Sequence, residues 1–309
     1  MVLNELHFFE QLWTPEDKGK LISREQAIRL AEKLLLIQRK GYNTGFDDYS
    51  MFTAEASALV NEMNLDSLTS EEIFTHFAKR EVALIGKSIV CEKTPQNIFY
   101  LKEIFELYPN AHVINMVRDP RAVMLSQKNK WQRRKLGGWY ITRREALRLR
   151  INYHPITLSK LWNAAIGAAL KFKDDQRMLT VIFEELLEEP EAVIRKICAH
   201  VGVEFNPEML MITQESSSIE MDSLEKGFKK ERAVNWRKGG LNDTEIWWCQ
   251  KISGDYMKKY GFELETIKPN YALIILYSFS FPVKLGFAFL MNLNRMKNIV
   301  DTLKRRLSG

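Results

Sequence analysis

The chain has 309 residues, of which 46% are hydrophobic and 27% charged, a composition that supplies one large folded domain with or without an appendage and excludes a disordered chain. The formal net charge of +6 favours an anionic ligand, but charge alone does not distinguish a nucleotide from a sulfated glycan, nucleic acid or acidic lipid. The three cysteines are widely spaced and form no metal-binding pattern, which favours a reducing, cytoplasmic compartment and a site without metal.

The N-terminal residues show no secretory signal, and residues 15–80 have the apolar spacing of helices. Before them, Glu5 and His7 stand one residue apart in an apolar stretch, so an extended backbone would place both side chains on one face. A carboxylate or imidazole in such surroundings can act as a general base. The alternative is that His7 is an ordinary core residue.

Strands and helices alternate from residue 88 onward. We expect strands at Ser88–Cys91 and Ala111–Val117, each followed by a helix, at Gln96–Tyr108 and at Pro120 to about Trp131. This alternation predicts an α/β domain, a parallel sheet flanked by helices, extending over residues 1–268. Further elements are expected as a helix at Ile156–Phe172, a strand at Leu179–Phe183, and helices at Pro190–Val201 and Asp243–Tyr260.

The junction after the strand ending at Val117 is the first candidate site. Arg118 follows the apolar run, Asp119 can cap the next helix, and Pro120 suits the first helical position. Ligands of open α/β sheets sit beyond the carboxyl ends of the strands, where helix amides, the Arg118 fork and the Ser126 hydroxyl could bind a phosphate. Alternatively, Arg118 pairs with a surface carboxylate and Ser126 has no special role.

Lys93 is the second candidate. It follows the preceding predicted strand within the sequence Cys-Glu-Lys-Thr-Pro-Gln-Asn, and we expect it to face the same crevice. A compact cation there could neutralise charge on a leaving phosphate. The alternative is a lysine in an ordinary strand-end turn.

Four sequence stretches together resemble the family of sulfotransferases that use 3′-phosphoadenosine 5′-phosphosulfate (PAPS), especially its carbohydrate-modifying and bacterial branches. "RDPRAVMLS" is similar to the family's 3′-phosphate motif, "EKTPQN" to the turn that carries a lysine beside the sulfuryl group, "ELHFF" to the segment of the catalytic glutamate, and "NWRKGGL" to a late basic loop.

The resemblance implies a P-loop NTPase-like sulfotransferase fold and in-line transfer of a sulfonate to a hydroxyl or amine of a carbohydrate or glycolipid, without metal or nucleic acid. It assigns Glu5 as base with His7 as the alternative, and Lys93 to the leaving phosphate. It also assigns cofactor binding to a group of five residues, Arg118, Ser126, Arg237, Lys238 and Gly239.

The family's first strand and its Gly-Ser/Thr-rich 5′-phosphosulfate loop have no counterpart within the 309 residues. The resemblance implies that Met1 falls just after these elements, as in an N-terminally truncated chain. We therefore expect the 309-residue chain to be inactive or very weak in transfer. A non-catalytic 3′-phosphonucleotide-binding protein is the alternative function. A P-loop kinase-like enzyme is disfavoured because the sequence lacks a Walker lysine.

Two regions carry less specific signals. Trp131, Trp139 and the basic run Arg133–Lys135 are expected to line the cleft or to form a solvated helix surface. In residues 269–309, the apolar stretch Tyr271–Leu293 precedes a basic cluster, Lys304–Arg306. This tail is expected to lie on a membrane surface as a helix or hairpin, with a membrane-spanning helix and packing on the domain or a partner as alternatives.

Overall fold

The computed structural model describes residues 2–41, 48–63, 68–136, 141–214 and 223–293, with residues 300, 303 and 307. Its internal contacts divide the chain into two compact units. Unit 1 comprises Met1–Pro109 with Asn294–Ile299, and unit 2 comprises Asn110–Leu293 with Val300–Gly309. Each unit is described by itself, and the domain boundary expected near residue 268 stays a prediction.

Unit 1 combines two short strand pairs with helices. β1 runs parallel to β4, with Val2 opposite Cys91 and Leu3 opposite Glu92, and β2 runs antiparallel to β3. The strands are β1 (Val2–Leu3), β2 (Leu21–Ile22), β3 (Leu68–Thr69) and β4 (Cys91–Glu92), and the α-helices are α1 (Arg24–Lys40), α2 (Thr53–Glu62), α3 (Ser70–Ala83) and α4 (Leu101–Leu107). Short helical turns are η1 (Phe8–Leu12), η2 (Pro15–Asp17), η3 (Ser50–Phe52) and η4 (Pro95–Tyr100).

Local signals start the helices of unit 1, and an aromatic cluster holds its N-terminal turn in place. Ser23 and Gln26 form a capping box at the start of α1. Phe8 stacks on Phe74 of α3 with ring centroids 4.2 Å apart. Trp13 is fully buried beside them. Stacked and edge-on ring pairs add stabilisation to the burial itself, so this cluster anchors the segment that follows β1.

Two sequence expectations for unit 1 need correction. The predicted strand at Ser88–Cys91 begins only at Cys91, because residues 88–90 leave Ile89 exposed and pair with no strand in the described part of the chain. The extended Glu5–His7 segment is also wrong. His7 has a φ of 52° and starts the turn η1, so the two side chains are not presented by a strand.

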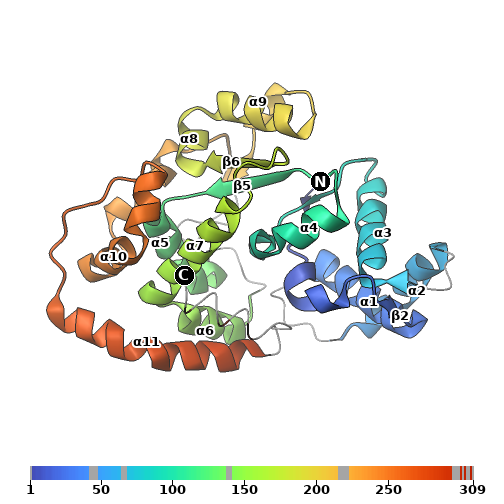
Figure 1. Ribbon diagram of the computed structural model, residues 1–309, viewed down its shortest axis with the longest axis horizontal. Helices are drawn as coiled ribbons and strands as arrows, with labels where there is room; N and C mark the ends of the chain where they lie inside the picture. The colour runs from blue at the N-terminus through green and yellow to red at the C-terminus, as the bar shows by residue number, and fades with distance from the viewer. Residues whose placement is uncertain are drawn as a thin grey trace. The chain divides into compact units, whose positions relative to one another are not determined.

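Unit 2 is built around the parallel pair β5 and β6, which lie side by side in Figure 1 with α8 and α9 on one side and α5 and α7 on the other. The register runs from Val113 opposite Met178 to Val117 opposite Ile182. The strands are β5 (Val113–Val117), β6 (Met178–Ile182), β7 (Thr213–Gln214) and β8 (Ser223–Lys226). The α-helices are α5 (Pro120–Asn129), α6 (Arg143–Asn152), α7 (Pro155–Leu170), α8 (Phe183–Glu188), α9 (Pro190–Val201), α10 (Asp243–Lys259) and α11 (Tyr271–Asn292). Shorter turns are η5 (Lys130–Lys135), η6 (Pro207–Leu210), η7 (Lys230–Ala233) and η8 (Asn235–Lys238).

The core of unit 2 joins the end of β5 to the helices that follow. Val117, Ile166 of α7 and Met257 of α10 are buried against one another. A second cluster packs α5 against η8 and α10, through Leu125, Trp236 and Ile246. Parallel strand pairs flanked by helices confirm the predicted α/β class, and they position the end of β5 beside the start of α5.

Candidate active site

The parallel strands of unit 1 bring the first two candidate residues together. Glu5 follows the end of β1 and Lys93 follows the end of β4, and because the strands run in the same direction these ends lie at the same edge. The Lys93 Nζ forms an ion pair with Glu5 Oε1. Both side chains remain open to solvent, with 63% of the Lys93 side chain and 38% of the Glu5 side chain exposed. A carboxylate and a cation are thus held in contact at an accessible edge.

Glu92 connects the two strand ends. Its Oε1 accepts a hydrogen bond from the Leu6 backbone N–H at 3.4 Å, and its carboxylate also accepts from the Thr94 hydroxyl and the Asn97 amide. Burial raises the pKa of Glu92, while these hydrogen bonds lower it. The sequence reasoning assigned Glu92 no role. The pattern that could have indicated a role for Glu92 is an acidic residue at a strand end followed by Thr and Asn two and five residues later.

His7, the alternative base, lies beside the same pair. Its Nδ1 is 2.9 Å from Glu10 Oε2 and its Nε2 is 3.9 Å from Glu5 Oε2. The His7 backbone N–H donates to Thr94 Oγ1 at 3.2 Å, which ties η1 to the turn after β4. The arrangement makes His7 a neighbour of the Glu5 carboxylate rather than a residue isolated in an apolar core.

Arg118 lies at the junction of β5 and α5 in unit 2. One guanidinium nitrogen, Nη2, donates to the carbonyl of Arg232 at 3.0 Å, and the group stacks 4.6 Å from the ring centre of Phe183. Arg118 Nε is buried and has no hydrogen-bond partner among the described residues. Burial lowers the pKa of Arg118, against the attraction of Glu184. A desolvated cation with unused hydrogen-bonding capacity suits an anionic ligand.

Arg121, by contrast, is committed to the fold. It is 1% exposed, and its guanidinium donates to both oxygens of the Asp119 carboxylate, at 2.7 Å from Nη2 to Oδ2 and 3.0 Å from Nε to Oδ1. Asp119 also accepts from the Arg121 backbone N–H, which confirms the predicted helix cap. The Arg121 guanidinium stacks 3.9 Å above the ring of Trp236.

That stacking joins α5 to the loop that carries the other predicted cofactor residues. Arg237 and Lys238 end η8, and Gly239 follows. Arg237 is exposed and forms an ion pair with Glu265 at 2.7 Å. The next residue, Gly240, has a φ of 92° and packs so closely on Leu125 of α5 that a Cβ would lie 2.6 Å from its Cδ1. Unit 2 therefore brings this loop against the helix that carries Ser126.

The basic run after α5 is only partly a solvated surface. Arg133 is buried and donates to the Leu136 carbonyl at 3.2 Å, while Lys135 lies over the ring of Trp131. Trp139 lies outside the described residues. A role of this run in lining a cleft stays a prediction.

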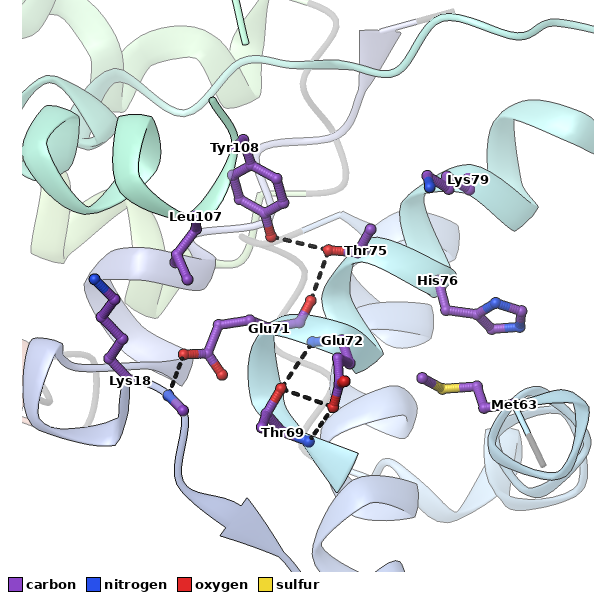
Figure 2. A pocket seen from close by; sticks show the side chains of 11 residues that line it. Lys18, Met63, Thr69, Glu71, Glu72, Thr75, His76, Lys79, Leu107 and Tyr108 are labelled. Atoms are coloured by element: carbon purple, nitrogen blue, oxygen red, sulfur yellow. Dashed lines mark hydrogen bonds between the residues drawn. The ribbon is translucent and has the colours of Figure 1, made fainter. Parts of the chain in front are cut away.

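A separate pocket of about 480 Å³ opens in unit 1 beside α3 (Figure 2). The Tyr108 hydroxyl is 3.0 Å from Thr75 Oγ1, which in turn donates to the Glu71 carbonyl at 2.7 Å. Glu71 Oε1 accepts from the Gly19 backbone N–H at 3.0 Å. Leu107 supplies apolar wall, and the lining residues do not include Glu5 or Lys93. Apart from Leu107 and Tyr108, the lining residues come from the segment 15–80.

Sequence comparison decides the family. The sequence model of the Sulfotransferase family matches residues 20–207. The chain belongs to the sulfotransferase family. The match includes Lys93, Arg118 and Ser126, whereas Glu5, His7 and the loop at residues 237–239 lie outside it. Membership establishes the enzyme class, a transferase of sulfonate groups, as predicted.

Relatives of this sulfotransferase are distant. A Caenorhabditis briggsae protein described as "Putative protein-tyrosine sulfotransferase" is 24% identical over 240 residues, which cover 72% of this chain and 80% of the relative. Two solved structures are the sulfotransferase domain from the curacin biosynthetic pathway and that from the Synechococcus PCC 7002 olefin synthase. Their identities are 15% and 16%, their TM-scores 0.46 and 0.47, and each comparison covers 85% of this chain, with 88% and 85% of the other chain.

Proposed function

We propose that this sulfotransferase transfers a sulfonate from PAPS to a hydroxyl or amine of a carbohydrate or glycolipid. The observation that supports this reaction is the ion pair between Glu5 and Lys93 at the ends of two parallel strands. The pair supplies a proton acceptor and a cation side by side, which are the two functions that sulfonate transfer requires of protein side chains.

In the proposed reaction, the acceptor oxygen or nitrogen attacks the sulfur and forms a new bond to it, while the bond from sulfur to the 5′-phosphate oxygen breaks. The acceptor proton passes to Glu5. The electron pair of the broken bond stays on the leaving phosphate, where Lys93 neutralises the charge that develops. No redox change occurs, and this scheme requires no metal.

Arg118 and Ser126 are proposed to bind the 3′-phosphate, and the loop residues Arg237, Lys238 and Gly239 to contribute to the nucleotide site. The desolvated guanidinium of Arg118 supports the first assignment, because a charge-assisted hydrogen bond is strongest where water is excluded. The contact of Gly240 with α5 supports the second.

The pocket beside α3 is proposed to take part of the acceptor. Its hydroxyls and carboxylate suit a polyhydroxylated ligand, since Thr75, Tyr108 and Glu71 all present hydrogen-bonding atoms near it. A tyrosine acceptor is the second candidate, because the C. briggsae relative is described as a protein-tyrosine sulfotransferase.

A radiolabelled assay tests the proposal. The 309-residue chain is incubated with PAPS labelled in the sulfonate and with a panel of amino sugars, oligosaccharides, glycolipids and tyrosine-containing peptides. Since transfer by the 309-residue chain is expected to be very weak, we expect a low level of label on a carbohydrate or glycolipid. This label should be lost in Glu5→Gln and retained in Glu16→Gln, an exposed carboxylate elsewhere in unit 1. Label on the peptides alone would show that the acceptor is a tyrosine and not a carbohydrate or glycolipid. Binding of adenosine 3′,5′-bisphosphate without transfer to any acceptor would instead support a non-catalytic nucleotide-binding protein.

A further inference from the structure

Helix α11 presents an apolar face to solvent along its whole length. Its outward side chains include Ile275, Phe279, Val283 and Phe287, each more than half exposed, and Phe279 reaches 76%. Their spacing of four residues places them along one stripe of the helix. With 22 residues, α11 is about 33 Å long. An exposed apolar stripe of this length marks an interaction surface.

The opposite face of α11 contacts the rest of unit 2 through polar side chains. Asn292 is buried. Its side-chain Nδ2 donates to Asn152 Oδ1 at 2.8 Å, and its side-chain Oδ1 accepts from Arg148 of α6. Lys284 donates to the Tyr153 carbonyl at 3.2 Å. His154, buried at the start of α7, packs against the ring of Tyr277. This face is adapted to the folded unit, not to lipid.

We propose that α11 lies in the plane of an anionic membrane surface, with its apolar stripe inserted and its polar face still bound to unit 2. The sequence that follows the helix, most of which lies outside the described residues, carries a charge that matches such a surface. Residues 294–309 contain five Lys and Arg residues and one acidic residue, Asp301, giving a local net charge of +4 (5 − 1). Arg144, which is exposed, precedes Arg148 by one turn of α6 and therefore lies on the side of α6 that contacts α11. Basic residues beside an amphipathic helix strengthen its binding to acidic lipids.

The length and composition of α11 would also allow it to cross a membrane. The contacts of its inner face oppose that arrangement. Crossing would remove Asn292 and Lys284 from their partners in unit 2. It would also place the Lys284 ammonium, which lies well inside the helix, in hydrocarbon, where an unpaired charge is unfavourable. An in-plane helix keeps these contacts and buries only the exposed stripe.

Vesicle flotation with the full chain tests this inference. The vesicles contain phosphatidylcholine with or without about 30% phosphatidylserine. The test variant carries Phe279→Glu and Phe287→Glu. The control carries Leu21→Glu and Leu84→Glu, which make the same charge change at side chains that are 68% and 61% exposed in unit 1. All four positions are exposed, so neither variant is expected to lose its fold, and circular dichroism checks this.

We expect the wild type and the control to float with acidic vesicles at low salt and to be released by alkaline carbonate. Binding should weaken at about 0.5 M salt. The Phe279/Phe287 variant should bind at least about tenfold more weakly. Failure of the wild type to float, or equal binding by both variants, would overturn the proposal, and resistance to carbonate would show a spanning helix instead. A wild-type dimer in light scattering that the Phe279/Phe287 changes dissociate, without vesicle binding, would assign the stripe to a second copy of the chain and also overturn it.

Discussion

Mutation of Arg121 should mainly lower the stability of the protein, whereas mutation of Arg118, three residues before it, should mainly weaken nucleotide binding. Arg121 is 1% exposed, forms a multiply hydrogen-bonded pair with Asp119 and stacks on Trp236. The Arg121→Ala change leaves the Asp119 carboxylate, itself 5% exposed, without its counter-ion. Breaking a buried pair on one side lowers the free energy of unfolding by about 3–5 kcal/mol, and we expect a loss of that size.

Arg118 should behave differently, because it has fewer partners than Arg121: it stacks on Phe183 and is attracted by Glu184, but it forms no multiply hydrogen-bonded ion pair among the described residues. It donates one described hydrogen bond, to the Arg232 carbonyl, and burial already disfavours its charged form. We expect Arg118→Ala to change the free energy of unfolding by less than about 1 kcal/mol. If Arg118 binds the 3′-phosphate, the loss of one or two charge-assisted hydrogen bonds should weaken binding of adenosine 3′,5′-bisphosphate about 10- to 100-fold.

Urea unfolding followed by tryptophan fluorescence and calorimetric titration with adenosine 3′,5′-bisphosphate measure the two quantities. The reasoning is refuted if Arg118→Ala destabilises the protein as much as Arg121→Ala does, or if it leaves nucleotide affinity unchanged. Titration with adenosine 5′-monophosphate provides the control, since the Arg118 change should have little effect on a ligand that lacks the 3′-phosphate.

Three further changes have outcomes that the structure specifies. Burial lowers the pKa of His154 from its usual 6.5 to about 4, so the unfolded chain binds the proton more readily between these values; stability should therefore fall as the pH drops from about 6.5 toward 4, and His154→Gln should flatten that fall in pH-dependent urea unfolding. Gly240→Ala should lower the melting temperature more than Gly239→Ala, because both residues have positive φ but only the Cβ at residue 240 would meet Leu125, and a melting curve showing equal effects would contradict this. Glu92→Ala removes the acceptor shared by the two strand ends and should slow sulfonate transfer while leaving calorimetric affinity for adenosine 3′,5′-bisphosphate within a few-fold of wild type.

The sequence predicted best what local signals determine. The Asp119–Pro120 start of α5 and the bounds of α9 at Pro190 and Val201 agree with the structure, because capping side chains and proline act within one turn of the chain. The resemblance to a family assigned Lys93 and Glu5 to one reaction, but their ion pair was not predicted, since residues 88 apart in sequence leave no local signal of contact.

The rest depended on contacts between distant segments. A left-handed backbone at His7, rare for a residue other than glycine, is held by Thr94 and by the aromatic cluster behind η1. Arg121 differs from Arg118 through its ion pair with Asp119 and through Trp236 and Gln250, and the last two are more than a hundred residues away in sequence. Likewise, the apolar composition of α11 did not indicate which of its faces packs on the rest of unit 2.

A comparison of two lysines tests whether Lys93 stabilises the leaving phosphate during transfer. Lys93→Ala and the control Lys87→Ala, an exposed lysine before β4, are assayed for transfer of labelled sulfonate at saturating PAPS and for binding of adenosine 3′,5′-bisphosphate. We expect Lys93→Ala to lower turnover about 100- to 1000-fold with a much smaller change in nucleotide affinity, and Lys87→Ala to match wild type. Turnover that Lys93→Ala leaves at the wild-type level, or that both changes lower equally, would contradict this expectation.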